Sequence, residues 1–237
     1  MSADLAEVEF VFDFVSPYAY LAHHKLCTFL RNSGNRLKYT AVDLDALKAQ
    51  AGNTGPSTRE QPLKFAYART DLQRWASLYG IPLVPPSGYG SGRLNRALPY
   101  ANAAGMARAY IDAVWAEIWG QGGDMNDEGV LTRVAGRLGL HSDQLLEFAD
   151  SAEASTLYSA AVASAHDRGV FGVPTILWRD QMWWGNDRLD FVATALGVGN
   201  AGADGGHFHN AHSRQSLILR NSHEAHVFEP RNMTGGL

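Results

Sequence analysis

The sequence of 237 residues has a single cysteine, Cys27. One thiol excludes an internal disulfide and a Cys-x-x-Cys redox pair. Because Cys27 lies beyond the opening turns of a predicted helix, a buried structural thiol is favoured over a reactive one. The sequence therefore argues against a disulfide-stapled fold and against a dithiol oxidoreductase.

Positive charge and long apolar runs are also scarce. There are 20 Lys and Arg against 24 Asp and Glu, a formal net charge of -4, so nucleic acid is not predicted as a partner. No segment approaches the roughly 20 consecutive apolar residues of a membrane helix. Residues 1–9 lack the pattern of a secretory signal. We therefore expect a cytoplasmic protein that binds neither nucleic acid nor membranes.

The chain does have enough apolar content for a large core, with 46% hydrophobic and 19% charged residues. From residue 10 it runs Phe-Val-Phe-Asp-Phe-Val-Ser-Pro-Tyr-Ala, which predicts a strand buried on both faces. Ser16 before Pro17 is typical of a helix N-terminus. The Ser16 hydroxyl should therefore lie at the positive end of a helix, where an anion or a thiolate is stabilised. Capping alone would also explain this serine.

The remaining pattern predicts an α/β protein interrupted by helices. A helix ending near Gly34 and a strand over 37–44 follow Ser16, and this unit implies parallel strands. From about Gln61 the pattern is helical for roughly a hundred residues. Strand character returns at 174–178 and 182–184 as an antiparallel hairpin.

Two groups of residues mark apolar helix faces in the helical stretch: Leu72, Trp75, Leu78 and Tyr79, and then Ile111, Val114, Trp115 and Ile118. A closing helix, capped by Asn186 or Asp187, ends at Gly197.

This order of elements predicts a thioredoxin-like fold with an inserted all-helical domain. We assign residues 1–44 and 169–199 to the thioredoxin-like domain, 45–168 to the inserted domain, and 200–237 to a flexible tail. Five of the nine histidines lie in this tail. No cysteines or rigid frame surround them, so no metal site is predicted.

A second informative segment is Phe171-Gly172-Val173-Pro174-Thr175. Proline directly before a strand is a typical setting for a cis peptide bond, although the sequence does not fix the isomer. In a thioredoxin-like fold this loop lies opposite the start of the first helix. The backbone of Val173 would then be free to pair with a peptide-like ligand. A plain strand entry would explain the motif in isolation.

Three separated motifs carry a resemblance to a known family. They are Phe-Asp-Phe-Val-Ser-Pro-Tyr-Ala-Tyr near the start, Asp-Leu-Gln-Arg-Trp-Ala with Tyr-Gly-Ile-Pro-Leu in the insert, and Phe-Gly-Val-Pro-Thr followed by Trp-Trp-Gly-Asn-Asp-Arg-Leu. Together, over residues 8–197, they resemble the 2-hydroxychromene-2-carboxylate isomerase family of naphthalene degradation. That family is related to kappa-class glutathione transferases and DsbA-type oxidoreductases.

The resemblance implies a glutathione-dependent isomerase that interconverts 2-hydroxychromene-2-carboxylate and trans-o-hydroxybenzylidenepyruvate. It also implies a homodimer. Ser16 would be the catalytic residue, as hydrogen-bond donor to the glutathione thiolate, because a serine without a base is a poor nucleophile. The other glutathione-binding residues implied are Val173, Trp184, Gly185, Asn186 and Asp187.

The family's substrate positions fall on Lys48, Thr58, Arg59 and Tyr89. Lys48 and Arg59 would pair with the carboxylate of an aromatic substrate, and Tyr89 would offer a ring and a hydroxyl. Thr58 replaces an expected asparagine. The loop 87–92 is richer in glycine than expected, so the position of Tyr89 is open.

Two alternatives remain from the sequence. A kappa-like glutathione transferase acting on xenobiotics would share Ser16, Val173 and Asp187 but would not require Lys48 or Tyr89. A non-catalytic thioredoxin-like binding module would show no glutathione affinity.

Overall fold

The computed structural model describes residues 7–31 and 33–198. Within this part lies one sheet with the strand order β2-β1-β3-β4. The strands are β1 (Glu7–Phe12), β2 (Arg36–Ala41), β3 (Thr175–Trp178) and β4 (Gln181–Trp184). β1 pairs with β2 in parallel, and β3 pairs antiparallel with β1 and β4. The predicted parallel unit and the predicted hairpin are both confirmed.

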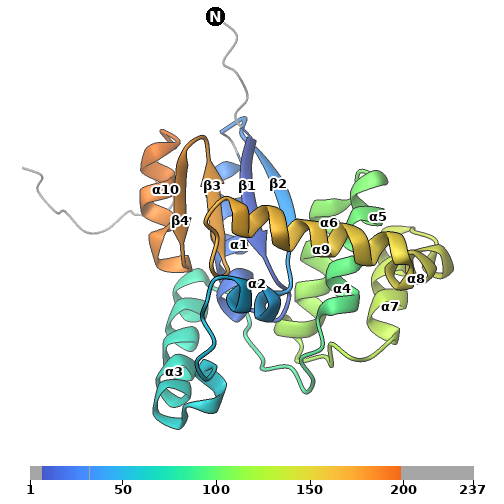
Figure 1. Ribbon diagram of the computed structural model, residues 1–237, viewed down its shortest axis with the longest axis horizontal. Helices are drawn as coiled ribbons and strands as arrows, with labels where there is room; N and C mark the ends of the chain where they lie inside the picture. The colour runs from blue at the N-terminus through green and yellow to red at the C-terminus, as the bar shows by residue number, and fades with distance from the viewer. Residues whose placement is uncertain (1–6, 32, 199–237) are drawn as a thin grey trace, which may run out of the picture. The chain divides into compact units, whose positions relative to one another are not determined.

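Helices make up most of the remaining described chain (Figure 1). They are α1 (Pro17–Leu30), α2 (Leu44–Gln50), η1 (Thr58–Glu60), α3 (Pro62–Tyr79), α4 (Gly92–Arg96), α5 (Leu98–Ala103), α6 (Ala107–Trp115), the π-helical turn η2 (Ala116–Gly120), α7 (Gly129–Leu138), α8 (Ser142–Asp150), α9 (Ala152–Asp167), η3 (Asn186–Arg188) and α10 (Leu189–Ala195). None of the described helices is long and apolar enough to cross a membrane.

The central strand β1 is buried on both faces, as its sequence predicts. Phe10 and Phe12 belong to a cluster with residues of α1 and α10. Val11 belongs to a second cluster, with Leu47 of α2 and Val162 of α9. Successive side chains of a strand point to opposite faces, so this alternation places helices on both sides of the sheet.

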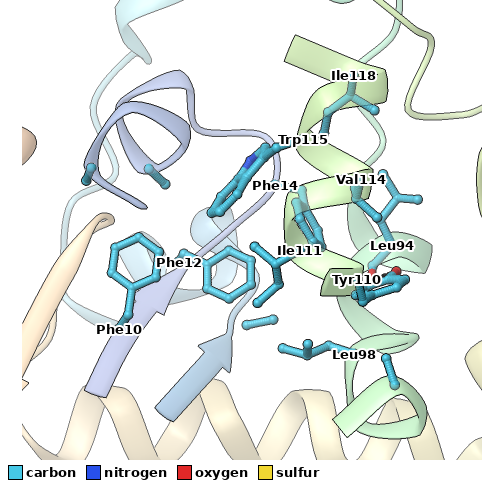
Figure 2. Packing of buried hydrophobic residues seen from close by; sticks show 14 of the residues in the cluster. Phe10, Phe12, Phe14, Leu94, Leu98, Tyr110, Ile111, Val114, Trp115 and Ile118 are labelled. Carbon is cyan, nitrogen blue, oxygen red and sulfur yellow. Dashed lines mark hydrogen bonds between the residues drawn. The ribbon is translucent and has the colours of Figure 1, made fainter. Parts of the chain in front are cut away.

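The sheet and the helical segment share a single core. The ring of Trp115 lies 5.1 Å from that of Phe12 and 5.2 Å from that of Phe14. Figure 2 shows these rings beside Ile111 of the same helix, α6. The predicted apolar face of α6 is therefore confirmed as buried. The domain boundaries at residues 45 and 168 stay a prediction, and the proposed tail, 200–237, lies outside the described residues.

The strand predicted over 37–44 is wrong at its carboxyl end. β2 ends at Ala41, and Asp43 accepts hydrogen bonds from the backbone N–H groups of Asp45 and Ala46. Asp43 therefore caps a new helix, α2, which the apolar pattern had concealed. The first helix also ends earlier than predicted, at Leu30.

The predicted apolar face of α3 is only partly buried, since Leu72, Trp75 and Tyr79 are half-buried. Leu78 is 72% exposed, and Ala76 is the only buried residue in this helix. Gly80 does end the helix, in the left-handed conformation with φ 67°. At the closing helix, the predicted capping by Asn186 or Asp187 is also wrong, because the N-cap residue is Gly185 for η3 and Arg188 for α10, and neither helix has a side-chain cap.

Candidate functional site

Ser16 caps α1, as predicted. Its Oγ accepts a hydrogen bond of 3.2 Å from the backbone N–H of Ala19, and Pro17 occupies the first turn. The side chain is almost buried, with 6% exposure. Within the described residues, the hydroxyl proton of Ser16 is donated to no acceptor. The hydroxyl can therefore cap the helix and still donate to a ligand.

The loop before β3 lies beside the same end of β1. Val11 is paired with Thr175, so the antiparallel register brings Val173 next to the residues that follow β1. The Val173-Pro174 peptide bond is cis. No hydrogen bond within the described part of the chain engages the backbone of Val173. Its N–H and C=O groups are therefore candidates for pairing with a bound peptide.

The end of β4 forms a wall against this loop. The Pro174 carbonyl accepts a hydrogen bond of 2.9 Å from the backbone N–H of Gly185. Trp184 is half-exposed, and a Cβ added at Gly172 would lie 2.9 Å from its Nε1. Glycine at 172 thus lets the indole pack against the loop. Gly185 has φ 104°, a conformation that favours glycine.

Asn186 and Asp187 follow directly. Asn186 is 4% exposed, and its Nδ2 makes no hydrogen bond of full geometry in the described structure, although its side chain is close enough to the Tyr79 hydroxyl to oppose the rise that burial causes in the Tyr79 pKa. A buried amide without such a hydrogen bond is uncommon and points to a missing acceptor. Asp187 is half-exposed, and its carboxylate is paired with Nη1 of Arg188 at 2.5 Å.

A pair of residues that lie in two of the sequence motifs, but were assigned no role from the sequence, joins α1 to α3. The Tyr18 hydroxyl donates a hydrogen bond of 3.0 Å to Oδ2 of Asp71. Burial raises the pKa of Tyr18, as do this hydrogen bond and the negative charges of Asp71 and Asp187. Two carboxylates therefore lie near the head of α1, where a cationic ligand group would be attracted.

Among the residues predicted to bind substrate, two are in contact. The guanidinium carbon of Arg59 lies 3.6 Å from the centre of the Tyr89 ring, and that ring lies 6.3 Å from the ring of Trp119. Trp119 in turn donates from Nε1 to the carbonyl of Phe14 at 2.8 Å. Arg59 and Tyr89 are thus linked through Trp119 to the turn that carries Ser16.

Lys48 and Thr58 are less closely connected. Thr58 opens η1 directly before Arg59. The ammonium group of Lys48 lies 3.8 Å from a carboxylate oxygen of Asp45, and among the described residues no hydrogen bond or ion pair joins it to Arg59 or Tyr89. The structure brings Arg59 and Tyr89 together but does not add Lys48 to them.

A largely apolar groove of about 1090 Å³ runs along α3. Its walls include Arg69, Gln73, Leu83, Pro85 and Trp119. Trp119 is the residue that this groove shares with the turn at Ser16. No group of three or more His, Cys, Asp or Glu side chains suited to a metal ion occurs in the part of the chain that the structure describes.

The chain is similar in sequence and in structure to known proteins. Residues 7–197 match the family described as the DSBA-like thioredoxin domain. A Pseudomonas putida protein named 2-hydroxychromene-2-carboxylate isomerase is 42% identical over 190 residues, which cover 80% of this chain and 94% of that protein. This chain belongs to the 2-hydroxychromene-2-carboxylate isomerase family.

A solved structure of a 2-hydroxychromene-2-carboxylate isomerase superposes with a TM-score of 0.78 at 41% identity, covering 81% of this chain and 94% of that one. Glutathione S-transferase kappa 1 from Rattus norvegicus is more distant, with 23% identity over 207 residues, 80% of this chain and 90% of the relative. The predicted thioredoxin-like fold, isomerase family and isomerase class are therefore confirmed.

In this isomerase family member, the sequence motifs mark residues in short turns more directly than residues within helices. Ser16 and Val173 lie in short segments that the motifs mark directly. Trp119 lies in a helical turn that none of the motifs covers, and Asp71 opens the second motif but was assigned no role from the sequence.

Proposed function

We propose that this protein is a glutathione-dependent isomerase that interconverts 2-hydroxychromene-2-carboxylate and trans-o-hydroxybenzylidenepyruvate. The observation that carries the proposal is the hydroxyl of Ser16, which lies at the N-terminus of α1 with its proton free to be donated. The family membership supplies the substrate class.

The residues around Ser16 fit glutathione. The backbone of Val173 could pair with the cysteinyl part of glutathione as a short added strand. The Nδ2 of Asn186 could donate to a γ-glutamyl carboxylate oxygen. The Asp187 carboxylate is suited to the ammonium group of the same moiety. Trp184 and Gly185 would complete this wall.

Ser16 would act on the sulfur of the bound glutathione. When bound, glutathione supplies a thiolate that adds reversibly to the conjugated ring system of the substrate and leaves after bond rotation. The Ser16 hydroxyl would donate a hydrogen bond to that thiolate. The N-terminus of α1 adds a positive potential at the same point. Both effects lower the pKa of the thiol, so more thiolate is present at neutral pH.

The substrate would lie on the side of Ser16 that Tyr89 and Trp119 form. Arg59, already stacked on Tyr89, offers a cation for the carboxylate. We assign Lys48 and Thr58 to the same pocket as polar residues that would contact the substrate. Lys48 would have to move closer to Arg59 and Tyr89 when the substrate binds. A cation near the developing enolate charge would stabilise the transition state.

The test is an ultraviolet assay of chromene carboxylate isomerisation, with and without glutathione, on three proteins. These are the wild type, Ser16→Ala and Ser151→Ala. Ser151 is a matched control because it caps α9 with a hydrogen bond of 3.1 Å from the N–H of Ala154. Both substitutions remove a helix cap worth about 0.5–2 kcal/mol.

Ser16→Ala is expected to lower kcat by about 10- to 100-fold, the range for losing a hydrogen bond to a charged group. Ser151→Ala should leave kcat unchanged. Equal rates for all three proteins would remove Ser16 from the mechanism. Conjugates of glutathione that accumulate without isomerisation would indicate a kappa-like transferase instead.

A homodimer in the cytoplasm is part of the same proposal. Leu63, Tyr67 and Leu78 of α3 are 90%, 64% and 72% exposed, which supports an interface along this helix. A glutathione-dependent enzyme also needs a compartment with a reduced glutathione pool, such as the cytosol. Sedimentation equilibrium would test the dimer. Leu78→Glu should dissociate it, whereas Phe191→Glu on α10 should not, and a monomeric wild type would exclude the interface.

A further inference from the structure

A buried carboxylate, that of Asp13, precedes Ser16 by three residues in the chain. Asp13 is the first residue after β1, and it is 3% exposed. Its oxygens accept hydrogen bonds from four donors: Ser91 Oγ at 2.6 Å, Asn95 Nδ2 at 2.7 Å, the N–H of Leu44 at 3.0 Å and the N–H of Val15 at 3.1 Å. Three of these donors reach Oδ1 and one reaches Oδ2, so both carboxylate oxygens are hydrogen-bonded.

The four donors come from segments that are far apart in the sequence. Val15 directly precedes Ser16. Leu44 is the first residue of α2, the helix that carries Lys48. Ser91 follows Tyr89 by two residues. A single side chain therefore ties the turn of the proposed thiolate donor to two segments of the proposed substrate pocket.

Asn95 extends the same network to the backbone. Its Nδ2 donates to Asp13, and also to the Tyr158 hydroxyl at 2.9 Å. This orientation leaves its Oδ1 to accept the N–H of Phe14 at 3.3 Å. The carbonyl of Phe14 is held by Trp119. The peptide groups leading to Ser16 are thus fixed by side chains.

Every neighbour within hydrogen-bonding distance of Asp13 is a donor. Burial raises the pKa of the Asp13 carboxyl, and the hydrogen bonds from Asn95, Ser91 and the two backbone N–H groups oppose that rise. No Lys, Arg or His forms an ion pair with it among the described residues. The network therefore depends on hydrogen bonds in which Asp13 only accepts.

We propose that Asp13 is a positioning residue, which holds the Ser16 hydroxyl and the Tyr89 loop, residues 87–92, in fixed relation through Ser91 and Asn95. This inference rests on the proposed function and deepens it. Loosening the network would misplace the thiolate donor relative to the substrate, a displacement that lowers the catalytic rate without removing any group that contacts either ligand.

Glu9 provides a matched comparison. It is also a buried carboxylate on β1, 8% exposed, and it is satisfied by Arg168, Lys38 and Thr40. Its partners lie on β2 and next to α9, and none of them belongs to the proposed site. Glu9→Gln therefore reports the effect of disturbing a buried carboxylate on this strand without disturbing Ser16.

The experiment compares wild type, Asp13→Asn, Ser91→Ala and Glu9→Gln in the full chain. In Asp13→Asn an NH₂ group replaces one carboxylate oxygen, so a hydrogen-bond donor faces the donors that surround this side chain. The variant should lower kcat by about 10- to 100-fold. Removing the negative charge of Asp13 would by itself lower the pKa of a nearby thiol, so a rise in the pKa of the bound glutathione thiol, followed by thiolate ultraviolet absorbance, would report a displaced Ser16 hydroxyl. Ser91→Ala should lower kcat/KM for the chromene carboxylate by about 2- to 10-fold and leave glutathione affinity unchanged. Glu9→Gln should lower only Tm.

Hydrogen exchange gives a readout that does not depend on catalysis. If the network couples the two segments, Ser91→Ala should accelerate exchange both in 87–92 and at residues 14–16. Acceleration confined to 87–92 would overturn the inference, and so would an Asp13→Asn protein that behaves like Glu9→Gln. If Asp13→Asn does not fold, the hydrogen-exchange result for Ser91→Ala still tests whether the network couples the two segments. An inactive wild type, or Ser16→Ala with wild-type rates, would instead overturn the proposed function.

Discussion

The buried ion pairs of Glu9 make a quantitative prediction about acid stability. The carboxylate receives two hydrogen bonds from Arg168, at 2.7 and 2.8 Å, one from Thr40 at 2.7 Å and one from Lys38 at 3.2 Å. Burial alone would raise the pKa of Glu9. The bonds from Arg168, Thr40 and Lys38 outweigh that effect and hold the pKa at about 2, below its ordinary value of 4.5.

The magnitude follows from this difference in pKa. At about 1.4 kcal/mol for each pKa unit, the full difference corresponds to about 3 kcal/mol of folding free energy. Arg168 and Lys38 are 38% and 50% exposed, so water screens their charges. We therefore expect about 1–2 kcal/mol. Because the folded pKa is depressed, this stability is present above pH 4.5 and is lost as the pH falls towards 2.

The assay is denaturant unfolding of wild type and Glu9→Gln at several pH values from 7 down to 2.5. At pH 7 the variant should have a lower free energy of unfolding by about 1–2 kcal/mol. The gap should narrow as the pH falls below 4.5, because Glu9 then binds a proton in the unfolded chain but stays ionised in the folded chain until the pH approaches 2. A gap that stays constant over this range would refute the assignment of the stability to an ionised Glu9.

Three further predictions concern single residues. Gly172→Ala should displace the indole of Trp184, at a cost of about 0.5–1.5 kcal/mol for the change of rotamer, and so weaken glutathione binding by about 2- to 10-fold. Isothermal calorimetry measures the affinity, and the Tm should be unchanged. Cys27 should resist an aromatic disulfide reagent until the protein unfolds, because burial raises its thiol pKa to about 12; rapid labelling of the native protein would contradict this. Trp119→Phe should lower the free energy of unfolding by about 1–3 kcal/mol, because the Phe14 carbonyl loses its donor, and denaturant titration measures this.

The sequence determined those features that a few neighbouring residues decide. The alternation around Phe10 and Phe12 defined a doubly buried strand, and Ser16 with Pro17 defined the helix start. Caps and short periodic patterns depend on local backbone geometry, so they are visible without the fold. The failures were local too, since the cap at Asp43 ended a strand that the apolar pattern had extended.

The tertiary structure decided which distant residues meet. The stacking of Arg59 on Tyr89, and the link from Trp119 to Phe14, join segments that no shared periodicity connects. Asp13 lies within the first motif, but the sequence alone assigned it no role. Its four donors come from segments up to 82 residues away. Such contacts arise from packing of the whole core, because the free energy that orders them is gained only when the separate elements close on one another.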